Sequence, residues 1–357
     1  MPRPPAMTGA ADRRPGYEDP ADRPPPPHRR RALGLLLLLA ALALAGLGSL
    51  AFGANPLTFD QVWRGLWRPD TSQESIIVWT LRVPRTLVGM VVGAAFGVAG
   101  ALIQALTRNP LADPGILGVN AGAGFAVTLG AGFFGLSGIT GHIWFAFLGA
   151  AAATVLVYLI GSAGRGGAAP VTLVLAGVAL GAVLTGFATF LTLIDENTFR
   201  SVRTWGLGSI ARTGLDDTLA VLPFLLIGMV IAVSLSGALN SIALGDDLAA
   251  SLGVNAARAR VLGIVAVTLL AGGATALTGG IAFAGLMVPH VVRWFTGPDQ
   301  RWIIAGSAPA AAVLVLAADV LGRVVARPGE VEVGIVTAVI GAPVLIALVR
   351  RRKASGL

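Results

Sequence analysis

The sequence predicts an all-α, polytopic membrane protein with about ten transmembrane helices, and three observations support this prediction. The 357 residues are 55% hydrophobic and 12% charged, whereas soluble domains carry about 25% charged residues. The mean hydropathy is +0.79. The apolar residues form blocks close to the ~20 residues that a helix needs to cross about 30 Å of hydrocarbon. A water-soluble fold of this length would need a polar shell that this composition does not supply.

The composition also excludes several kinds of site. Cysteine is absent, which excludes disulfides and thiolate metal ligands. His28, His142 and His290 are too scattered to match a metal-ligand spacing. The net charge is +8, but the basic residues lie between the apolar blocks rather than on one face. This distribution is typical of a membrane protein's topology and does not favour nucleic-acid binding. We therefore expect no bound metal, no cofactor on this chain, no nucleic-acid partner and no enzymatic activity.

The amino-terminal segment differs in composition from the rest of the chain. Residues 1–31 are rich in Pro, Arg and Asp and lack apolar periodicity, which is typical of a disordered cytoplasmic tail. The apolar stretch that follows Arg31 is longer than the apolar core of a signal peptide, and further spans follow it. We therefore predict an uncleaved first helix and a single transmembrane domain over residues 32–352.

Ten apolar segments are predicted to be helical. The abundant glycines, 48 in all, suit close helix packing in lipid. The predicted connections are short except for residues 53–85 and 195–217. The expected helices cover residues 32–52, 86–106, 116–136, 143–161, 171–194, 218–237, 260–279, 281–297, 302–325 and 333–349.

The charge distribution predicts the orientation of the chain. When the amino terminus is placed inside, most of the 26 Lys and Arg residues fall on inner segments. This bias follows the positive-inside rule with both termini in the cytoplasm. We therefore expect a multi-pass protein of the inner or plasma membrane with lipid around its spans.

The chain lacks the residues of a common ATP site. A P-loop needs a lysine that follows a glycine-rich turn, but the only lysine is Lys353, flanked by Arg352 and Ala354. If ATP drives this protein, a separate chain must bind the ATP.

A short segment between the sixth and seventh predicted spans is bracketed by Gly245 and Gly253. Asp246 or Asp247 would cap the amino end of a helix here, and Leu248 and Leu252 would share one face at i, i+4. Such a short helix is unstable alone and must lie against something. It is either an ordinary interfacial helix or a docking helix for a cytoplasmic partner.

Charged residues lie near the outer ends of two spans. Arg82 and Arg85 stand just before the second predicted span, where they either anchor the helix at the headgroups or pair with carboxylates of an external partner. Asp319 and Arg323 are spaced i, i+4 near the outer end of the ninth span. They form either an internal ion pair or part of a functional site.

Two motifs carry proline at unusual positions. Pro289, His290 and Arg293 fall in the eighth predicted span, where proline implies a kink and a lone histidine is more often a core residue than a proton relay. The run Arg108–Gly115 includes Asn109, Pro110 and Pro114 and ends the second span in a rigid inner loop.

Taken together and in order, these motifs resemble the FecCD type of permease, found in ATP-binding-cassette importers for iron-siderophores, haem and vitamin B12. The resemblance covers about residues 30–352. It rests on four stretches: Leu81–Arg85, Gly100–Gly118, Gly285–Arg293 and Gly341–Pro343.

The resemblance implies a type II importer fold of ten helices that pairs with a second permease, either the same chain or a related one. Two cytoplasmic ATP-binding subunits and an extracytoplasmic substrate-binding protein would complete the assembly. The following roles are implied for residues of this chain: binding-protein docking by Arg82, Arg85 and Arg323; coupling to the ATPase by Gly245, Asp246, Asp247, Leu248, Ala249, Leu252 and Gly253; and, more loosely, the cytoplasmic gate near Gly167, Ala168 and Ala169. The fifth helix would line the pore.

One departure from the family pattern bears on docking. Where many members have a proline two residues after a glutamate, this chain has Glu332 after Glu330. The extra acid is expected to alter the outer surface and not the fold.

The predicted function is uptake of a metal chelate by alternating access, driven by a separate ATPase. The main alternative is a secondary transporter that uses an ion gradient. Such a carrier needs carboxylates or broken helices in mid-membrane, and Asp319 is the sole candidate carboxylate.

Overall fold

The computed structural model describes residues 28–68, 70–163 and 170–354, and these residues form helices and no strands. The predicted all-α fold is confirmed. The helices in chain order are α1 (His28–Ala51), α2 (Phe59–Trp67), α3 (Gln73–Ile76), η2 (Ile77–Arg82), α4 (Val83–Thr107), η3 (Pro114–Leu117), α5 (Val119–Phe134), α6 (Gly138–Ser162), α7 (Pro170–Ile194), α8 (Glu196–Gly206), α9 (Leu215–Ala243), α10 (Asp246–Ser251), α11 (Ala256–Val267), η4 (Thr268–Gly272), α12 (Gly273–Thr278), α13 (Ala284–Thr296), α14 (Gln300–Val325) and α15 (Val333–Ala354).

Seven helical segments of the described chain are long and apolar enough to cross a membrane. They are His28–Ala51, Gln73–Thr107, Gly138–Ser162, Val171–Ile194, Leu215–Ala243, Ala256–Thr278 and Gln300–Val325. Two shorter apolar helices, Val119–Phe134 and Val333–Ala347, accompany them. With α13, these segments account for all ten predicted apolar helices in their predicted order.

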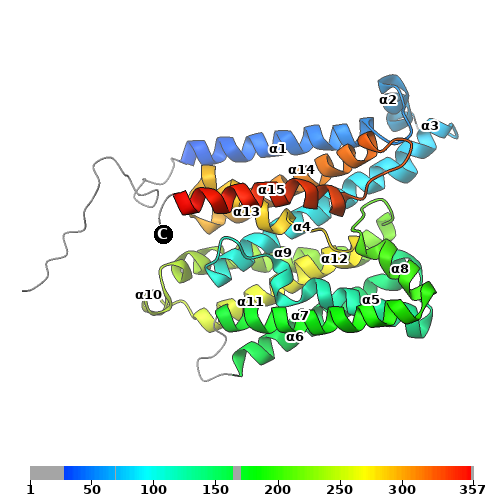
Figure 1. Ribbon diagram of the computed structural model, residues 1–357. Helices are drawn as coiled ribbons and strands as arrows, with labels where there is room; N and C mark the ends of the chain where they lie inside the picture. The colour runs from blue at the N-terminus through cyan, green and yellow to red at the C-terminus, as the bar shows by residue number, and fades with distance from the viewer. Residues whose placement is uncertain (1–27, 69, 164–169, 355–357) are drawn as a thin grey trace, which may run out of the picture.

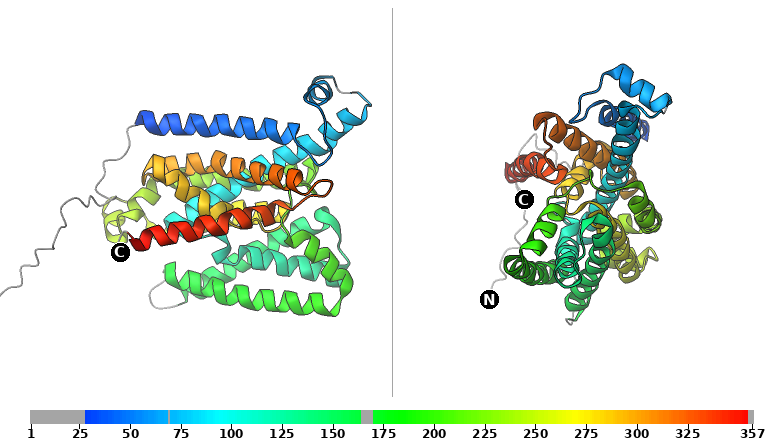
Figure 2. Two further views of the ribbon diagram at one scale, coloured as in Figure 1. Left: turned by 45° about the horizontal axis from the view of Figure 1, so that its top comes forward. Right: turned by 90° about the vertical axis from the view of Figure 1, so that its right-hand side faces the viewer.

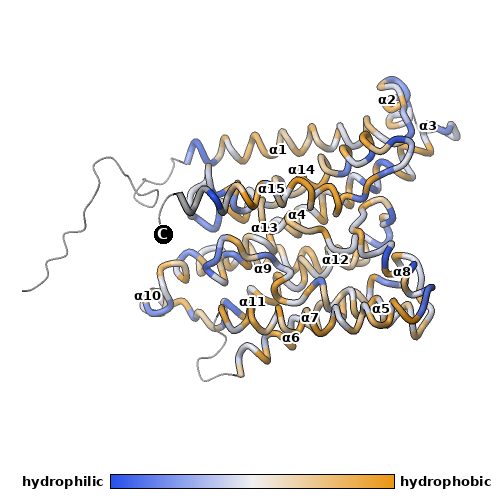
Figure 3. The backbone as a smooth tube through the Cα atoms, viewed as in Figure 1, coloured by the Kyte–Doolittle hydropathy of each residue, from blue (hydrophilic) through white to orange (hydrophobic). Residues whose placement is uncertain are grey.

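The long helices run side by side, so the molecule has two distinct ends (Figure 1). Helices α2, α3 and α8 lie at one end, called here the α8 end. Helix α10 and the carboxyl end of α15 lie at the other, called the α10 end (Figures 1 and 2). Polar residues concentrate at these two ends, and apolar residues dominate the helices between them (Figure 3). This banding is what a protein that spans a bilayer requires.

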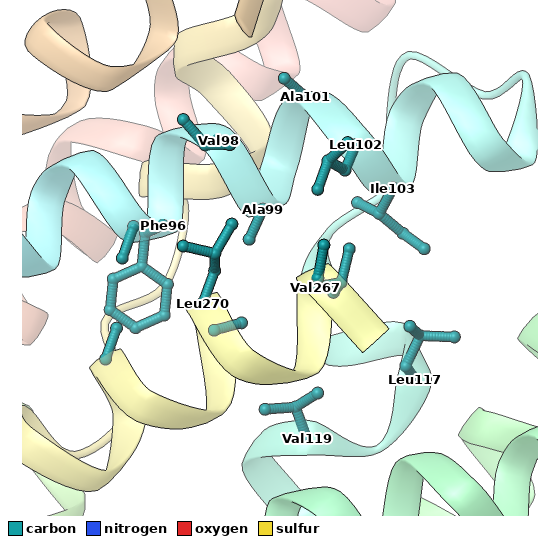
Figure 4. Packing of buried hydrophobic residues seen from close by; sticks show 14 of the residues in the cluster. Phe96, Val98, Ala99, Ala101, Leu102, Ile103, Leu117, Val119, Val267 and Leu270 are labelled. Carbon is teal, nitrogen blue, oxygen red and sulfur yellow. The ribbon is translucent and has the colours of Figure 1, made fainter. Parts of the chain in front are cut away.

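Helix α4 is the centre of the bundle. Of the most apolar window in Gln73–Thr107, 78% of residues are buried inside the chain, against 11% for α1 at the periphery. The side chains of Phe96, Ala99 and Ile103 on α4 point toward the segment that carries Val267 and Leu270, and all five residues belong to one buried cluster (Figure 4). Helix α1 instead exposes most of its leucines, as expected of a helix that faces lipid.

Glycine permits the closest helix crossing of α4. A Cβ atom on Gly100 would overlap the carbonyl oxygen of Gly285 at the start of α13. The two backbones therefore touch at a point where no side chain fits, which is the small-residue packing expected between membrane helices. This contact explains why glycine occupies position 100, whereas a Cβ atom on Gly285 would instead meet Pro114 and the carbonyl oxygen of Phe96.

The second predicted span, 86–106, is longer than expected. Helices α3, η2 and α4 form one continuous segment, Gln73–Thr107. Arg82 ends η2 and Pro84 is the second residue of α4, so this proline, which has no N–H to donate, lies where the π-helical turn passes into the α-helix. The expectation that Leu81–Arg85 stands outside the helix is therefore wrong.

The eighth predicted span, 281–297, is much shorter than expected. Helix α13 has 13 residues, which at 1.5 Å per residue extend only about 20 Å. It starts after Phe283, whose φ of 67° is left-handed and ends any continuation from α12. Helix α13 is therefore a short helix packed on α4 and α14 rather than a full membrane span.

The remaining boundary differences are small. Helix α1 begins at His28, so residues 28–31 of the predicted tail are helical. There Arg31 is buried and its Nη1 lies 3.5 Å from Asp299 Oδ2 before α14. Residues 1–27 of the predicted tail and the loosely predicted gate at Gly167, Ala168 and Ala169 lie outside the described residues.

Candidate functional sites at the two ends of the bundle

Two of the three predicted docking arginines bind the carboxyl end of α1. Arg82 Nη1 donates to the carbonyl oxygens of Leu50 at 2.6 Å and Ala51 at 2.9 Å, and Nη2 donates to Asn55 O at 2.7 Å. Arg323 Nη1 donates to Phe52 O at 2.9 Å and to the carbonyl of Ser49. The last carbonyls of a helix lack partners within the helix and carry partial negative charge. The two guanidinium groups supply the missing hydrogen bonds and a positive charge that balances the partial negative charge.

The third predicted docking residue, Arg85, binds two acids. Its Nη2 lies 2.7 Å from Asp319 Oδ1, and its Nη1 lies 2.7 Å from Glu330 Oε2. Asp319 also pairs with Arg323 at 2.8 Å, one helical turn away. The internal ion pair expected from the i, i+4 spacing is therefore confirmed, and Arg85 extends it to a network between α4, α14 and the segment before α15.

The burial of these arginines limits what they touch. Arg82 and Arg323 are buried, and Arg85 is the most accessible of the three. All three line a pocket of about 210 Å³ at the α8 end, together with Glu330. An external carboxylate would reach Arg85 at the rim of this pocket before it reached the other two. A docking role for these arginines stays a prediction.

The extra acid of this chain, Glu332, has an internal partner. Its Oε1 lies 2.6 Å from Arg212 Nη2, and Arg212 Nη1 donates to Thr204 O at 2.7 Å. Glu332 thus joins the start of α15 to the loop that follows α8. The ion pair with Glu332 therefore holds the Arg212 side chain in place, and that side chain remains partly exposed.

Helix α10 lies between α9 and α11, as predicted, and is flanked by Gly245 and Gly253. Gly245 and Gly253 adopt φ values of 117° and 79°, which favour glycine. Ala249 is fully buried against α9, whereas Leu248 and Leu252 are 48% and 59% exposed. A six-residue helix that is held by one face and shows two leucines on another offers an apolar surface to a partner. The coupling role itself stays a prediction.

Asp246 anchors α10 by its side chain rather than capping it. Gly245 is the N-cap and receives no side-chain cap, so the expected aspartate cap is wrong. Instead Asp246 pairs with Arg260 of α11 at 2.7 Å and with Arg108 after α4. The hydrogen bond from Arg260 holds the pKa of the Asp246 carboxyl below its ordinary value of 3.8. Asp247 is exposed.

Gln104 connects two of the family-like motifs, and the sequence reasoning did not single it out. Its Nε2 donates to Leu286 O at 2.9 Å, and its Oε1 accepts from Arg293 at 3.4 Å. Pro289 has no N–H and interrupts the backbone hydrogen bonds of α13, and Gln104 binds a carbonyl beside that break. A buried amide within an apolar span was the available signal.

Two side-chain hydrogen bonds hold the loop after α4, and its rigidity stays a prediction. Asn109 Oδ1 accepts from Leu111 N at 3.0 Å across Pro110. Asp113 Oδ1 accepts from Gly115 N at 2.8 Å and caps η3, in which Pro114 is the first residue. Both bonds are side-chain turns typical of Asn and Asp. His290 lies edge-on to Trp294, with ring centroids 5.7 Å apart.

Within the described residues, no group of three or more His, Cys, Asp or Glu side chains could hold a metal ion.

Comparison with known proteins places these features in a family. The model of the FecCD transport family matches residues 38–351. The ferric enterobactin transport system permease protein FepD of Escherichia coli is 47% identical over 90% of this chain and 95% of its own length. The Fe(3+)-citrate import system permease protein YfmD of Bacillus subtilis is 41% identical over 86% of this chain and 91% of its own length.

A solved structure agrees with the sequence relatives. The chain resembles an inward-facing conformation of a transporter assigned to the metal-chelate type of ABC transporter, with a TM-score of 0.78 and 28% identity over 90% of this chain and 99% of that one. Since the family model and the relatives cover nearly the whole chain, this polytopic membrane protein belongs to the FecCD transport family.

Proposed function

We propose that the chain is the permease subunit of an ATP-binding-cassette importer that moves a ferric chelate, such as an iron-siderophore, into the cytoplasm. The observation that carries the proposal is the near full-length similarity to permeases named for ferric enterobactin and ferric citrate transport. The few charges within the spans suit a bulky chelate better than a bare cation, which would need a cage of oxygen ligands.

We propose that the energy for transport comes from a separate ATPase that binds α10. The chain has no P-loop lysine, so under this proposal it needs no cofactor of its own. Leu248 and Leu252 are exposed on a helix that Asp246 ties to Arg108 and Arg260. A helix fixed in this way would transmit displacement to α4 and α11 instead of bending. The α10 end would face the cytoplasm, together with both termini.

The substrate-binding protein is proposed to dock at the α8 end. Arg85 is the arginine most accessible to a carboxylate of that partner, whereas Arg82 and Arg323 would act by positioning the end of α1. A second permease, either a copy or a related chain, would complete the pore. The exposed apolar face of α7, which includes Val171, Leu175 and Val178, is available for such pairing.

The competing function is a secondary transporter, and one observation weighs against it. Asp319, the candidate for ion coupling, is buried between Arg85 and Arg323 and pairs with both. Both oxygens of this carboxylate already accept hydrogen bonds from guanidinium groups, which leaves it poorly placed to bind a coupling ion.

Reconstitution tests the proposal. The chain is placed in liposomes alone and together with its ATPase and binding protein, and uptake of a radioactive ferric chelate is measured. We expect uptake only in the complete system, and only when ATP is present on the side of the membrane where the ATPase lies. Uptake by the lone chain under an ion gradient would contradict the proposal and support the secondary transporter.

A further inference from the structure

Helix α2 carries three exposed aromatic side chains that the proposed transport function does not use. Phe59, Trp63 and Trp67 are spaced i, i+4, i+8 and are 75%, 56% and 66% exposed. Successive ring centroids lie 6.4 and 5.7 Å apart, so the rings form one continuous stripe. Large exposed aromatic stripes of this kind mark an interaction surface.

The helix has three distinct faces. Val62 and Gly65 are buried against the rest of the chain. Asp60 and Arg64 form an exposed ion pair on a second face. The aromatic stripe is the third face, and at 100° per residue it lies between the other two. One side of α2 therefore meets protein, one is polar, and one is apolar and aromatic.

The orientation of α2 is fixed by specific bonds. Thr58 and Gln61 form a capping box at its amino end. Gln61 Nε2 donates to Glu74 at 3.1 Å, and Trp79 Nε1 on η2 donates to Gly65 O at 3.0 Å. These bonds tie α2 to the start of the long α3–η2–α4 segment. These bonds therefore fix the orientation of the aromatic stripe relative to α3 and η2.

The position of α2 relative to α1 indicates what the stripe faces. The apolar part of α1, residues 32–51, is about 30 Å long at 1.5 Å per residue, which equals the hydrocarbon thickness of a bilayer. The end of α1 thus lies at the membrane boundary, and α2 begins eight residues later. Helix α2 lies across the direction of the spans, at the edge of the molecule beyond α1 (Figure 2).

The neighbouring surface is already apolar and lipid-facing. Leu44 and Leu47 on α1 and Leu81 on η2 are all more than half exposed. Helix α2 follows α1 at the polar α8 end of the bundle, and Trp is enriched at such a boundary in membrane proteins because its ring is apolar and its N–H is polar.

We propose that α2 is an interfacial helix whose Phe59, Trp63 and Trp67 insert into the phospholipid headgroup layer at the α8 end. The polar face with Asp60 and Arg64 lies toward water. The helix thereby fixes the depth of the α3–η2–α4 segment, and with it the arginine network, relative to the membrane surface.

Site-directed spin labelling tests this proposal, because the chain has no cysteine of its own. Trp63→Cys and Trp67→Cys are made in the full chain, labelled with a nitroxide and placed in phospholipid nanodiscs without partner proteins. Accessibility to oxygen and to a water-soluble nickel chelate gives the depth of each label. Asp60→Cys on α2 and Arg200→Cys on α8 are the controls.

The labels at 63 and 67 are expected about 5–10 Å below the headgroup boundary, with the labels at 60 and 200 in water. Equal access of the nickel chelate to all four labels would overturn the proposal. So would shielding of positions 63 and 67 that arises only when the binding protein is added, or spin–spin coupling between two copies in place of oxygen access.

A second measurement does not depend on the cysteine variants. Tryptophan fluorescence of the intact chain is measured in nanodiscs with lipids brominated near the headgroups, and compared with a Trp63→Phe, Trp67→Phe double variant. The proposal requires the quenched fraction to fall in the double variant. An unchanged quenched fraction would contradict it.

Discussion

Asp319 on α14 and Arg85 on α4 are joined by a two-pronged hydrogen bond, with Oδ1 2.7 Å from Nη2 and 3.0 Å from Nε of the arginine. The same carboxylate pairs with Arg323, which in turn binds the end of α1. One acid thus connects three membrane helices at the α8 end. This network is a structural element in its own right, whatever docks above it.

Asp319→Asn is expected to destabilise the protein strongly. Removing one partner of a buried ion pair leaves uncompensated charge, which costs about 3–5 kcal/mol, and here Arg323 would lose its only salt bridge among the described residues. The measurement is thermal unfolding of the purified protein in detergent. Glu196→Gln, which breaks the exposed pair with Arg200, is the matched control and should cost about 0–1 kcal/mol. Equal effects of the two variants would refute the structural role of Asp319.

Arg85→Glu is expected to weaken docking of the binding protein, because it reverses the most accessible charge of the arginine network. We expect at least about a tenfold loss of affinity, measured on the folded fraction by surface plasmon resonance. Arg64→Glu makes the same charge change on α2 at the same end and should have a much smaller effect. An unchanged affinity of folded Arg85→Glu protein would remove the docking assignment.

Gly100→Ala is expected to push α13 away from α4, since the added Cβ would overlap the carbonyl of Gly285. Overpacking of this kind costs about 1–3 kcal/mol, and the thermal unfolding midpoint should fall. Gly48→Ala on α1 is the control, because no heavy atom lies within 4 Å of its added Cβ. If Gly100→Ala were as stable as the control, the helices would not be in contact at this point.

Asp246→Asn is expected to loosen α10 without unfolding the spans. The Asp246 pKa is lowered in the folded protein, so the stabilising contribution is present above the ordinary pKa and is lost as pH falls through the folded one. At neutral pH it is fully present and, at a partly exposed site, worth about 1 kcal/mol or less. Hydrogen exchange of residues 246–251 should become faster in the variant. Asp247→Asn is the control, and equal exchange in both variants would contradict the anchoring role.

Local signals in the sequence were sufficient for some of these features. The paired glycines at 245 and 253 mark a short helix because each adopts a backbone conformation that other residues rarely take. The i, i+4 spacing of Asp319 and Arg323 indicates an ion pair as one of two alternatives, and the structure contains that pair. The apolar blocks predict the seven helices of membrane length because the thickness of a bilayer imposes that length.

Other features depend on tertiary contacts that no local pattern contains. Arg82 looks like a surface residue in sequence, but it is buried because the unpaired carbonyls at the end of α1 lie within its reach. The short length of α13 follows from the left-handed backbone at Phe283, a residue type that rarely marks such a turn. Gln104 gains its role from a carbonyl 182 positions away.

The central claim is that an external ATPase moves this chain through α10, and ATP-driven uptake by the complete complex tests it most directly. For the double variant Leu248→Asp, Leu252→Asp, the account predicts normal insertion into the membrane and loss of ferric chelate uptake. Uptake is lost because charged aspartate side chains do not fit an apolar cleft of the ATPase. Leu248→Met with Leu252→Met should preserve uptake. Uptake at the unmodified rate by the aspartate variant would contradict the account.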